Sequence, residues 1–220
     1  MTIEQSDRVS SARSQPGQAV WKAATGFITR KPLGAAGVVI IVTMIIMAVA
    51  PPLITSHDPV EWNLTDKLEA PSLTHWLGTD EMGRDLWSRI LMGARVSLLI
   101  GFASVAFGST FGGILGIASG WYGGKFDQVV QRIMDALMSI PGIILALAIT
   151  ASLGQSLFNI ILAVGIVQIP RANRVVRSQV LAVKESQYVE GARAIGASNL
   201  RIMTSHTTPQ CVAPWLIIAT

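Results

Sequence analysis

The sequence predicts an all-α fold, a polytopic bundle of transmembrane helices, and three observations lead to that prediction. Half of the 220 residues are hydrophobic, and the mean hydropathy is +0.50. Only 14% of the residues are charged, whereas a typical soluble domain carries about 25%. The charges are also clustered. This leaves long uncharged stretches of the kind that a membrane helix needs, because lipid cannot solvate charge.

Apolar stretches suited to membrane helices begin after a polar leader, residues 1–32. We expect spans at residues 33–54, 96–122, 129–153 and 157–169, and the start of a fifth near Val212. A bend is expected at Pro141 in the third span, because proline leaves a carbonyl without its helical partner. The stretch after Cys211 is too short to cross a bilayer. We therefore expect a C-terminally truncated chain whose natural product continues.

The distribution of Lys and Arg orients these spans. Basic residues gather before the first span and after the fourth, and two regions separated by an even number of spans lie on the same side. The positive-inside rule makes that side the cytoplasm. Residues 55–95, with seven acidic residues against four basic ones, then form an external loop. The first span could instead be a signal peptide cleaved after Ala48-Val49-Ala50, but the long leader and Pro51 argue against cleavage.

Composition and motifs disfavour several functional classes. The pI near 9.6 would suit a nucleic-acid partner, but the basic residues flank apolar spans and do not alternate with aromatic ones. The Gly-Gly-Lys at residues 123–125 is not a P-loop, because Phe126 stands where Ser or Thr is required. Cys211 is alone, and the three histidines lie far apart in the sequence. We therefore expect no disulfide, no cofactor and no catalytic residue.

Small residues recur at every fourth position of the second span. They are Ser104, Gly108, Gly112, Gly116 and Gly120. On a helix they form one groove that another helix can approach closely. Two interpretations stay open: simple tight packing, or a surface along which helices slide during transport.

A glycine-punctuated motif occupies the expected external loop. It reads Gly78-Thr79-Asp80-Glu81-Met82-Gly83-Arg84-Asp85. Its acidic residues could suggest calcium, but their spacing does not match an EF-hand loop and Arg84 lies among them, so no metal is expected. We expect Asp80 to cap the helix that leads into the second span.

A charged segment, residues 178–209, is expected to form two short helices. Val189, Ala192 and Ile195 would share one face of the first helix, and Gly196 can supply a left-handed turn after it. Ser198 can cap the second helix, which Pro209 would help to end. Taken by itself, this pattern also fits an amphipathic hairpin lying at the membrane surface.

The same segment resembles the "EAA" coupling loop of ABC importer permeases. Glu190-x-Ala192, then Gly196, then Pro209 match that pattern, while Gly191 departs from it. The motif around Gly78 to Asp85, with the preceding His75-Trp76-Leu77 and the following Ser88-Arg89, resembles the hallmark of dipeptide, oligopeptide and nickel importers. Within that branch, the chain is similar to the second of the two permease subunits.

This resemblance implies a type I ABC importer permease in a bacterial inner membrane, with residues 96–220 as its core and the N-terminus in the cytoplasm. The implied partners are a second permease subunit, two ABC ATPase subunits and an extracytoplasmic substrate-binding protein. Glu190, Ala192 and Gly196 would seat the ATPase, with Arg193 and Arg201 as charge partners, and Pro209 would complete the coupling loop. The implied cargo is di- or oligopeptides or nickel chelates. A passive channel or a secondary transporter of small solutes remains the alternative, although the scarcity of charge within the spans disfavours ion coupling.

Overall fold

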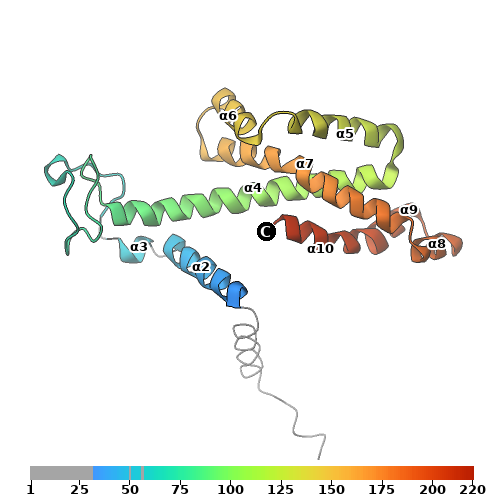
Figure 1. Cartoon of the computed structure of the whole chain (residues 1–220), viewed down its shortest axis with the longest axis horizontal. Coiled ribbons are helices and arrows are strands. Elements are labelled where there is room, and N and C mark those ends of the chain that lie inside the picture. Colours follow the sequence, from blue (N-terminus) through green and yellow to red (C-terminus); the bar gives the residue numbers. More distant parts are fainter. Residues whose placement is uncertain (1–31, 50, 56) are drawn as a thin grey trace, which may run out of the picture. The chain divides into compact units, whose positions relative to one another are not determined.

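The computed structural model describes residues 32–49, 51–55 and 57–220, and the regular elements of this part are helices (Figure 1). The predicted all-α fold is therefore confirmed. The chain divides into two compact units, residues 1–96 and 97–220, and each is described by itself. Nearly all of the expected leader, residues 1–32, lies outside the described residues.

In the described part of the first unit, the apolar helix α2, Pro32–Val49, comes first, and its side chains are almost all exposed. A short helix α3, Pro51–Ile54, follows. The expected span 33–54 thus covers α2 and α3, and residue 50 between them lies outside the described residues. The segment after α3, residues 57–85, is irregular apart from the 3-10 turn η1, Leu64–Asp66. We call this segment the GTD loop.

Helix α4, Leu86–Tyr122, is 37 residues long. At 1.5 Å per residue it measures about 56 Å, which exceeds the thickness of a hydrocarbon core. It begins ten residues before the expected second span, so position 96 lies inside a continuous helix. The helix ends before Gly123 and Gly124, whose φ angles are +63° and +59°, because this left-handed backbone cannot continue an α-helix.

The expected third span is two helices. Helix α5, Gly124–Met138, and helix α6, Gly142–Leu153, meet at an angle of 91°. Pro141 lies at the corner with an extended ψ of 127°, so the bend expected there is present. It is sharp enough to make the pair a broken span or a re-entrant hairpin. By length and composition, α2 and α4 are candidate membrane spans among the described residues, and the α5–α6 pair counts as a third if it is one span.

Helix α7, Leu157–Lys184, starts where the fourth span was expected and continues fifteen residues past its expected end at Ile169. Ser156 caps it, since its side chain accepts a hydrogen bond from the Asn159 N–H at 3.1 Å. Pro170 lies within the helix. The second half of α7 carries the basic residues that were placed in the cytoplasm, and this explains why apolar character stops midway along an uninterrupted helix.

The chain then forms α8, Gln187–Ala194, and α9, Asn199–Ile202. A π-helical turn η2, Met203–Thr207, joins α9 directly to α10, Thr208–Ile218. Helix α10 returns along α7 (Figure 1). The expectation that Pro209 ends a helix is wrong. It lies in the first turn of α10, which continues from the π-helical turn η2 without a break.

One hydrophobic core joins these elements in the second unit. It collects buried side chains from the end of α4 and from α7, α8, α9 and α10: Trp121, Val176, Val180, Val183, Val189, Ala192, Ile202 and Cys211. The short helices α8 and α9 are therefore held by tertiary packing, since helices of this length are unstable by themselves.

Candidate functional site

The turn between α8 and α9 has a defined backbone geometry. Gly196 has a φ of +83°, its N–H donates to the Arg193 carbonyl at 2.9 Å, and the Ala197 N–H donates to the Ala192 carbonyl at 3.1 Å. This pair of bonds is a Schellman motif, which needs a left-handed residue at the glycine position. Ser198 then caps α9 by accepting from the Arg201 N–H at 3.4 Å. We call residues 186–202 the α8–α9 segment.

Trp121, at the end of α4, anchors this segment. Its indole is buried, at 5% exposure. The Arg193 guanidinium and the Lys184 ammonium each lie 5.8 Å from a Trp121 ring centroid, within cation–π range. The Lys184 Nζ also donates to the Trp121 carbonyl at 2.7 Å. The α8–α9 segment is thus fixed to α4 as well as to α7.

The structure separates the expected coupling residues into inward and outward groups. Ala192 is buried in the core, so it packs α8 onto the chain. Glu190, Gly196, Arg201 and Pro209 are exposed. Arg193 is exposed too, although its guanidinium lies against Trp121.

The expectation for Ile195 is wrong, because this residue does not share the buried face of Val189 and Ala192. It follows the end of α8, which breaks the helical spacing, and it is 86% exposed. Leu200 on α9 is 63% exposed and Tyr188 on α8 is 46% exposed. These three residues form what we call the apolar tip. Periodicity did not reveal it, because the decisive position lies beyond the helix end.

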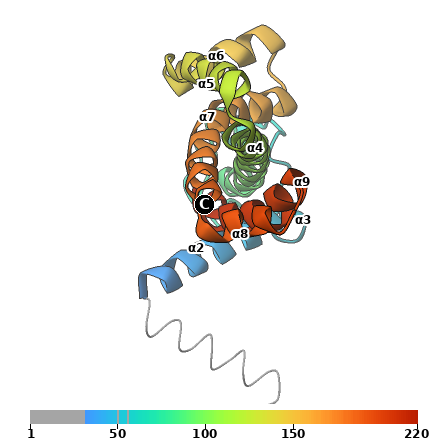
Figure 2. The same ribbon diagram turned by 90° about the vertical axis from the view of Figure 1, so that its right-hand side faces the viewer.

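The small-residue stripe of α4 faces α7, and the two helices lie side by side in both views (Figures 1 and 2). All five stripe residues are buried. A Cβ added at Gly116 would lie 2.7 Å from the Asn173 carbonyl oxygen, and one added at Gly120 would lie 2.9 Å from Val180 Cβ. At these glycines the two helices are too close for a Cβ, which is the small-residue packing that membrane helices use.

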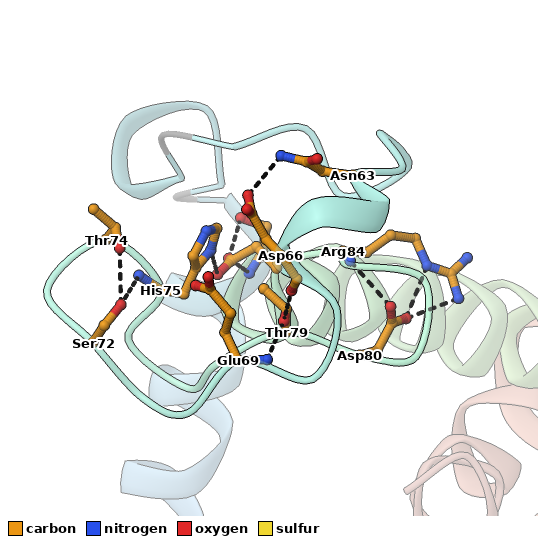
Figure 3. Close-up of polar contacts among 11 residues, drawn as sticks. Asn63, Asp66, Glu69, Ser72, Thr74, His75, Thr79, Asp80 and Arg84 are labelled. Carbon is orange, nitrogen blue, oxygen red and sulfur yellow. Dashed lines mark hydrogen bonds and ion pairs between the residues drawn. The ribbon is translucent and has the colours of Figure 1, made fainter.

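In the GTD loop, Asp80 organises the turn from residue 80 to residue 84 (Figure 3). Its Oδ1 accepts from the Met82 and Arg84 N–H groups at 2.8 and 3.0 Å. Its Oδ2 accepts from Arg84 Nε at 2.8 Å and pairs with Arg89. Burial raises the pKa of Asp80, but these hydrogen bonds and the Arg84 charge outweigh it and bring the pKa to about 2.

The expectation that Asp80 caps the helix is wrong, because Asp85 does so. Asp85 Oδ2 accepts from the Ser88 N–H at 2.8 Å and from the Ser88 hydroxyl at 2.7 Å, and α4 begins at Leu86. Gly78 and Gly83 have φ angles of +76° and +72°; Gly78 makes a tight turn before Asp80, and Gly83 makes one between Asp80 and Asp85. Burial raises the pKa of Asp85, whereas the bonds from Ser88 and His75 lower it, and the net shift is downward.

No metal site was expected from the sequence, but the GTD loop brings metal-ligand side chains together. His75 Nδ1 lies 3.1 Å from Asp85 Oδ1, and His57 lies beside them. The wide separation of the three histidines in the sequence gives no sign of this cluster. Folding of the loop brings two of the three to one place.

Comparison with known proteins identifies the chain. The fold defines a class: a polytopic, all-helical membrane protein whose α8–α9 segment packs on the core of the second unit. Residues 108–220 match the family described as binding-protein-dependent transport system inner membrane component, and residues 19–71 match the N-terminal transmembrane domain of oligopeptide transport permease C. The chain belongs to this family of binding-protein-dependent transport permeases, which confirms the resemblance seen in its motifs.

Individual relatives agree with this assignment. The chain is 40% identical over 200 residues to the dipeptide transport system permease protein DppC of Alkalihalophilus pseudofirmus, covering 91% of this chain and 66% of the relative. It is 43% identical over 188 residues to the probable D,D-dipeptide transport system permease protein DdpC of Escherichia coli K12, covering 86% and 63%. It is 37% identical over 192 residues to a glutathione transport system permease protein GsiD of Escherichia coli, covering 87% and 63%. The chain thus spans 63 to 66% of the length of these relatives.

Proposed function

We propose that this chain is a membrane-spanning permease subunit of an ATP-driven importer, and that its α8–α9 segment docks on an ATPase subunit. The observation that carries the proposal is the apolar tip. Ile195 and Leu200 are largely exposed, although the segment that bears them is firmly packed. A rigid segment with exposed apolar side chains at its end is suited to insert into a groove on a partner.

The anchoring of the segment supports a mechanical role. Helices α7 and α10 flank the α8–α9 segment in the chain, and all of them share one core with Trp121. A displacement of the docked segment would therefore move α4, α7 and α10 together and would not be absorbed locally. ATP binding and hydrolysis on the ATPase would switch these helices between two arrangements, as expected of a two-state rigid-body transition.

The proposed assembly contains this chain, a second permease subunit, two ATPase subunits and an extracytoplasmic substrate-binding protein. The N-terminus and the α8–α9 segment would be cytoplasmic, and the GTD loop external, because basic residues gather at the former and acidic ones at the latter. The names of the relatives support dipeptides or glutathione-like peptides as cargo, and the family matched by residues 19–71 supports oligopeptides. The ATPase subunits, and not this chain, would carry the hydrolytic chemistry.

Co-purification tests the proposal. The chain is co-expressed with the permease and ATPase encoded by neighbouring genes, and an Ile195→Asp variant is compared with the unaltered chain. We expect the unaltered chain to retain the ATPase and Ile195→Asp to lose it, because a carboxylate in an apolar groove is poorly solvated. The matched control is Leu73→Asp, since Leu73 is 97% exposed but lies in the GTD loop. If the unaltered chain retains no ATPase, a passive channel becomes the better interpretation. If Ile195→Asp retains it fully, docking lies elsewhere.

A further inference from the structure

The GTD loop gathers two imidazoles and one carboxylate from three separate stretches of sequence. His57 precedes η1, His75 precedes the Gly78–Asp85 motif, and Asp85 ends it. One ligand atom from each of the three residues lies within 4.8 Å of the other two. The rings of His57 and His75 have centroids 4.6 Å apart and are tilted by 36°. His75 and Asp85 are buried and His57 is half-buried.

These distances are close to those of a metal centre. Two ligand atoms that are each about 2.1 Å from a metal ion, at tetrahedral or octahedral angles, lie roughly 3.0 to 3.4 Å apart. His75 Nδ1 and Asp85 Oδ1 meet this condition at 3.1 Å. His57 must move closer by one to two ångströms, on the order of a side-chain rotation. Among the hydrogen bonds of the described residues none involves the His57 ring, so no such bond opposes that movement.

The surroundings favour a cation. A pocket of about 260 Å³ opens beside the three residues, and its lining consists of His57, Asp58, Glu61, Asn63, Asp66, His75, Gly83 and Asp85. This lining has four carboxylates and neither lysine nor arginine, so its potential is negative. The nearby Arg84 and Arg89 both pair with Asp80 and do not line the pocket, although Asp80 balances only one of their two charges.

The second oxygen of Asp85 is held in place independently of the first. Oδ2 accepts two hydrogen bonds from Ser88 at the start of α4, while Oδ1 points to His75. Such support of a ligating carboxylate fixes its orientation and increases metal affinity. The ring centroids of Trp76 and Trp87 lie 5.7 Å apart, and the two rings line a small space beside His57 and Asp85.

We propose that His57, His75 and Asp85 form a binding site for one divalent transition-metal ion, with Zn²⁺ as the best-fitting ion. Two imidazole nitrogens and a carboxylate select zinc, cobalt or nickel over magnesium and calcium, which prefer oxygen ligands. Water or a neighbouring carboxylate completes the coordination. The ion fastens residue 57 to the motif that precedes α4, so it acts as a structural clasp of the GTD loop. Such a clasp is separate from cargo transport and does not depend on the proposed docking role.

Cobalt binding tests this site. The full chain is purified in detergent, stripped with a chelator and titrated with Co²⁺ while its visible ligand-field absorption is recorded. We expect one Co²⁺ per chain, displaced by Zn²⁺ but not by excess Mg²⁺. The His57→Gln variant should bind Co²⁺ at least about tenfold more weakly, because it removes a ligand and leaves the His75–Asp85 pair intact. The control His206→Gln alters the remaining histidine, which lies in η2, and should bind as the unaltered chain does.

Two results would overturn the proposal. One is the absence of saturable Co²⁺ absorption in the unaltered chain, which would leave His75–Asp85 as a simple hydrogen bond. The other is equal affinity of the unaltered chain and His57→Gln, which would place the metal elsewhere. His57→Gln decides the question in preference to an Asp85 variant, because Asp85 also caps α4 and its loss threatens folding.

Discussion

Arg177 on α7 and Asp127 on α5 form a two-pronged ion pair. Arg177 Nε lies 2.7 Å from Asp127 Oδ1 and Nη2 lies 2.6 Å from Oδ2, and the two side chains are 29% and 15% exposed. Arg174 and Asp135 join the same two helices at 2.6 Å, but these side chains are 48% and 60% exposed. The two pairs therefore differ in burial and in the number of their hydrogen bonds, although both join the same two helices.

Replacement of Asp127 should cost far more stability than replacement of Asp135. Asp127→Asn leaves the partly buried Arg177 without its charged acceptor, so we expect the free energy of unfolding to fall by about 2 kcal/mol. Asp135→Asn breaks an exposed pair and should cost less than about 1 kcal/mol. Thermal unfolding in detergent, followed by circular dichroism, measures both. Equal losses would mean that burial does not decide the strength of these pairs.

Alanine at two glycines of α4 should have opposite effects. Gly116→Ala places a Cβ against the Asn173 carbonyl of α7, and we expect a loss of about 1 to 3 kcal/mol because backbone atoms cannot move aside. At Gly101 an added Cβ meets nothing within 4 Å, so Gly101→Ala should gain up to about 1 kcal/mol through helix propensity. The same unfolding measurement applies. A gain at both positions would contradict the close packing of α4 on α7.

The ionised form of Asp80 should stabilise the GTD loop, so this stabilisation should be lost at strongly acidic pH. Its pKa is about 2 in the folded chain, against an ordinary aspartate value of 3.8, so the folded state favours the ionised form. The stabilisation is complete above pH 3.8 and is lost as the pH falls toward 2. We therefore expect Asp80→Asn to be less stable than the unaltered chain at about pH 7 and to approach it near pH 2. Tryptophan fluorescence of the two chains during thermal unfolding at each pH measures the difference, and a gap that does not change with pH would refute the assignment.

Removal of Trp121 should loosen the α8–α9 segment. Trp121→Ala deletes a buried ring that contacts Arg193 and Lys184, and such a change in a core typically costs about 3 to 5 kcal/mol. We expect trypsin to cleave after Arg193 faster in this variant. Trp62→Ala is the control, because Trp62 is 65% exposed in the GTD loop. Peptide mass after brief digestion identifies the cut, and unchanged protection at Arg193 would show that Trp121 does not anchor the segment.

Features set by local sequence were predictable. Long uncharged stretches predicted helices, and Gly196 was expected to make a left-handed turn because few other residues tolerate that backbone. Helix bounds were less accurate, as with the start of α4 at Leu86 and the continuation of α7 through Pro170. Apolar composition indicates which residues can lie in a membrane, whereas a helix continues for as long as its backbone N–H and C=O groups keep their hydrogen bonds.

Contacts between distant residues were decided by tertiary structure alone. Nothing in the sequence indicates that Asp127 and Arg177, which are 50 residues apart, form a pair. Ala192 is buried whereas Ile195 is exposed, and this difference depends on where α8 ends. The meeting of His57, His75 and Asp85 likewise requires the turns at Gly78 and Gly83. Local chemistry selects the helix or the turn at each position. The packing of whole elements then determines which side chains meet, because that packing depends on the burial of many residues together.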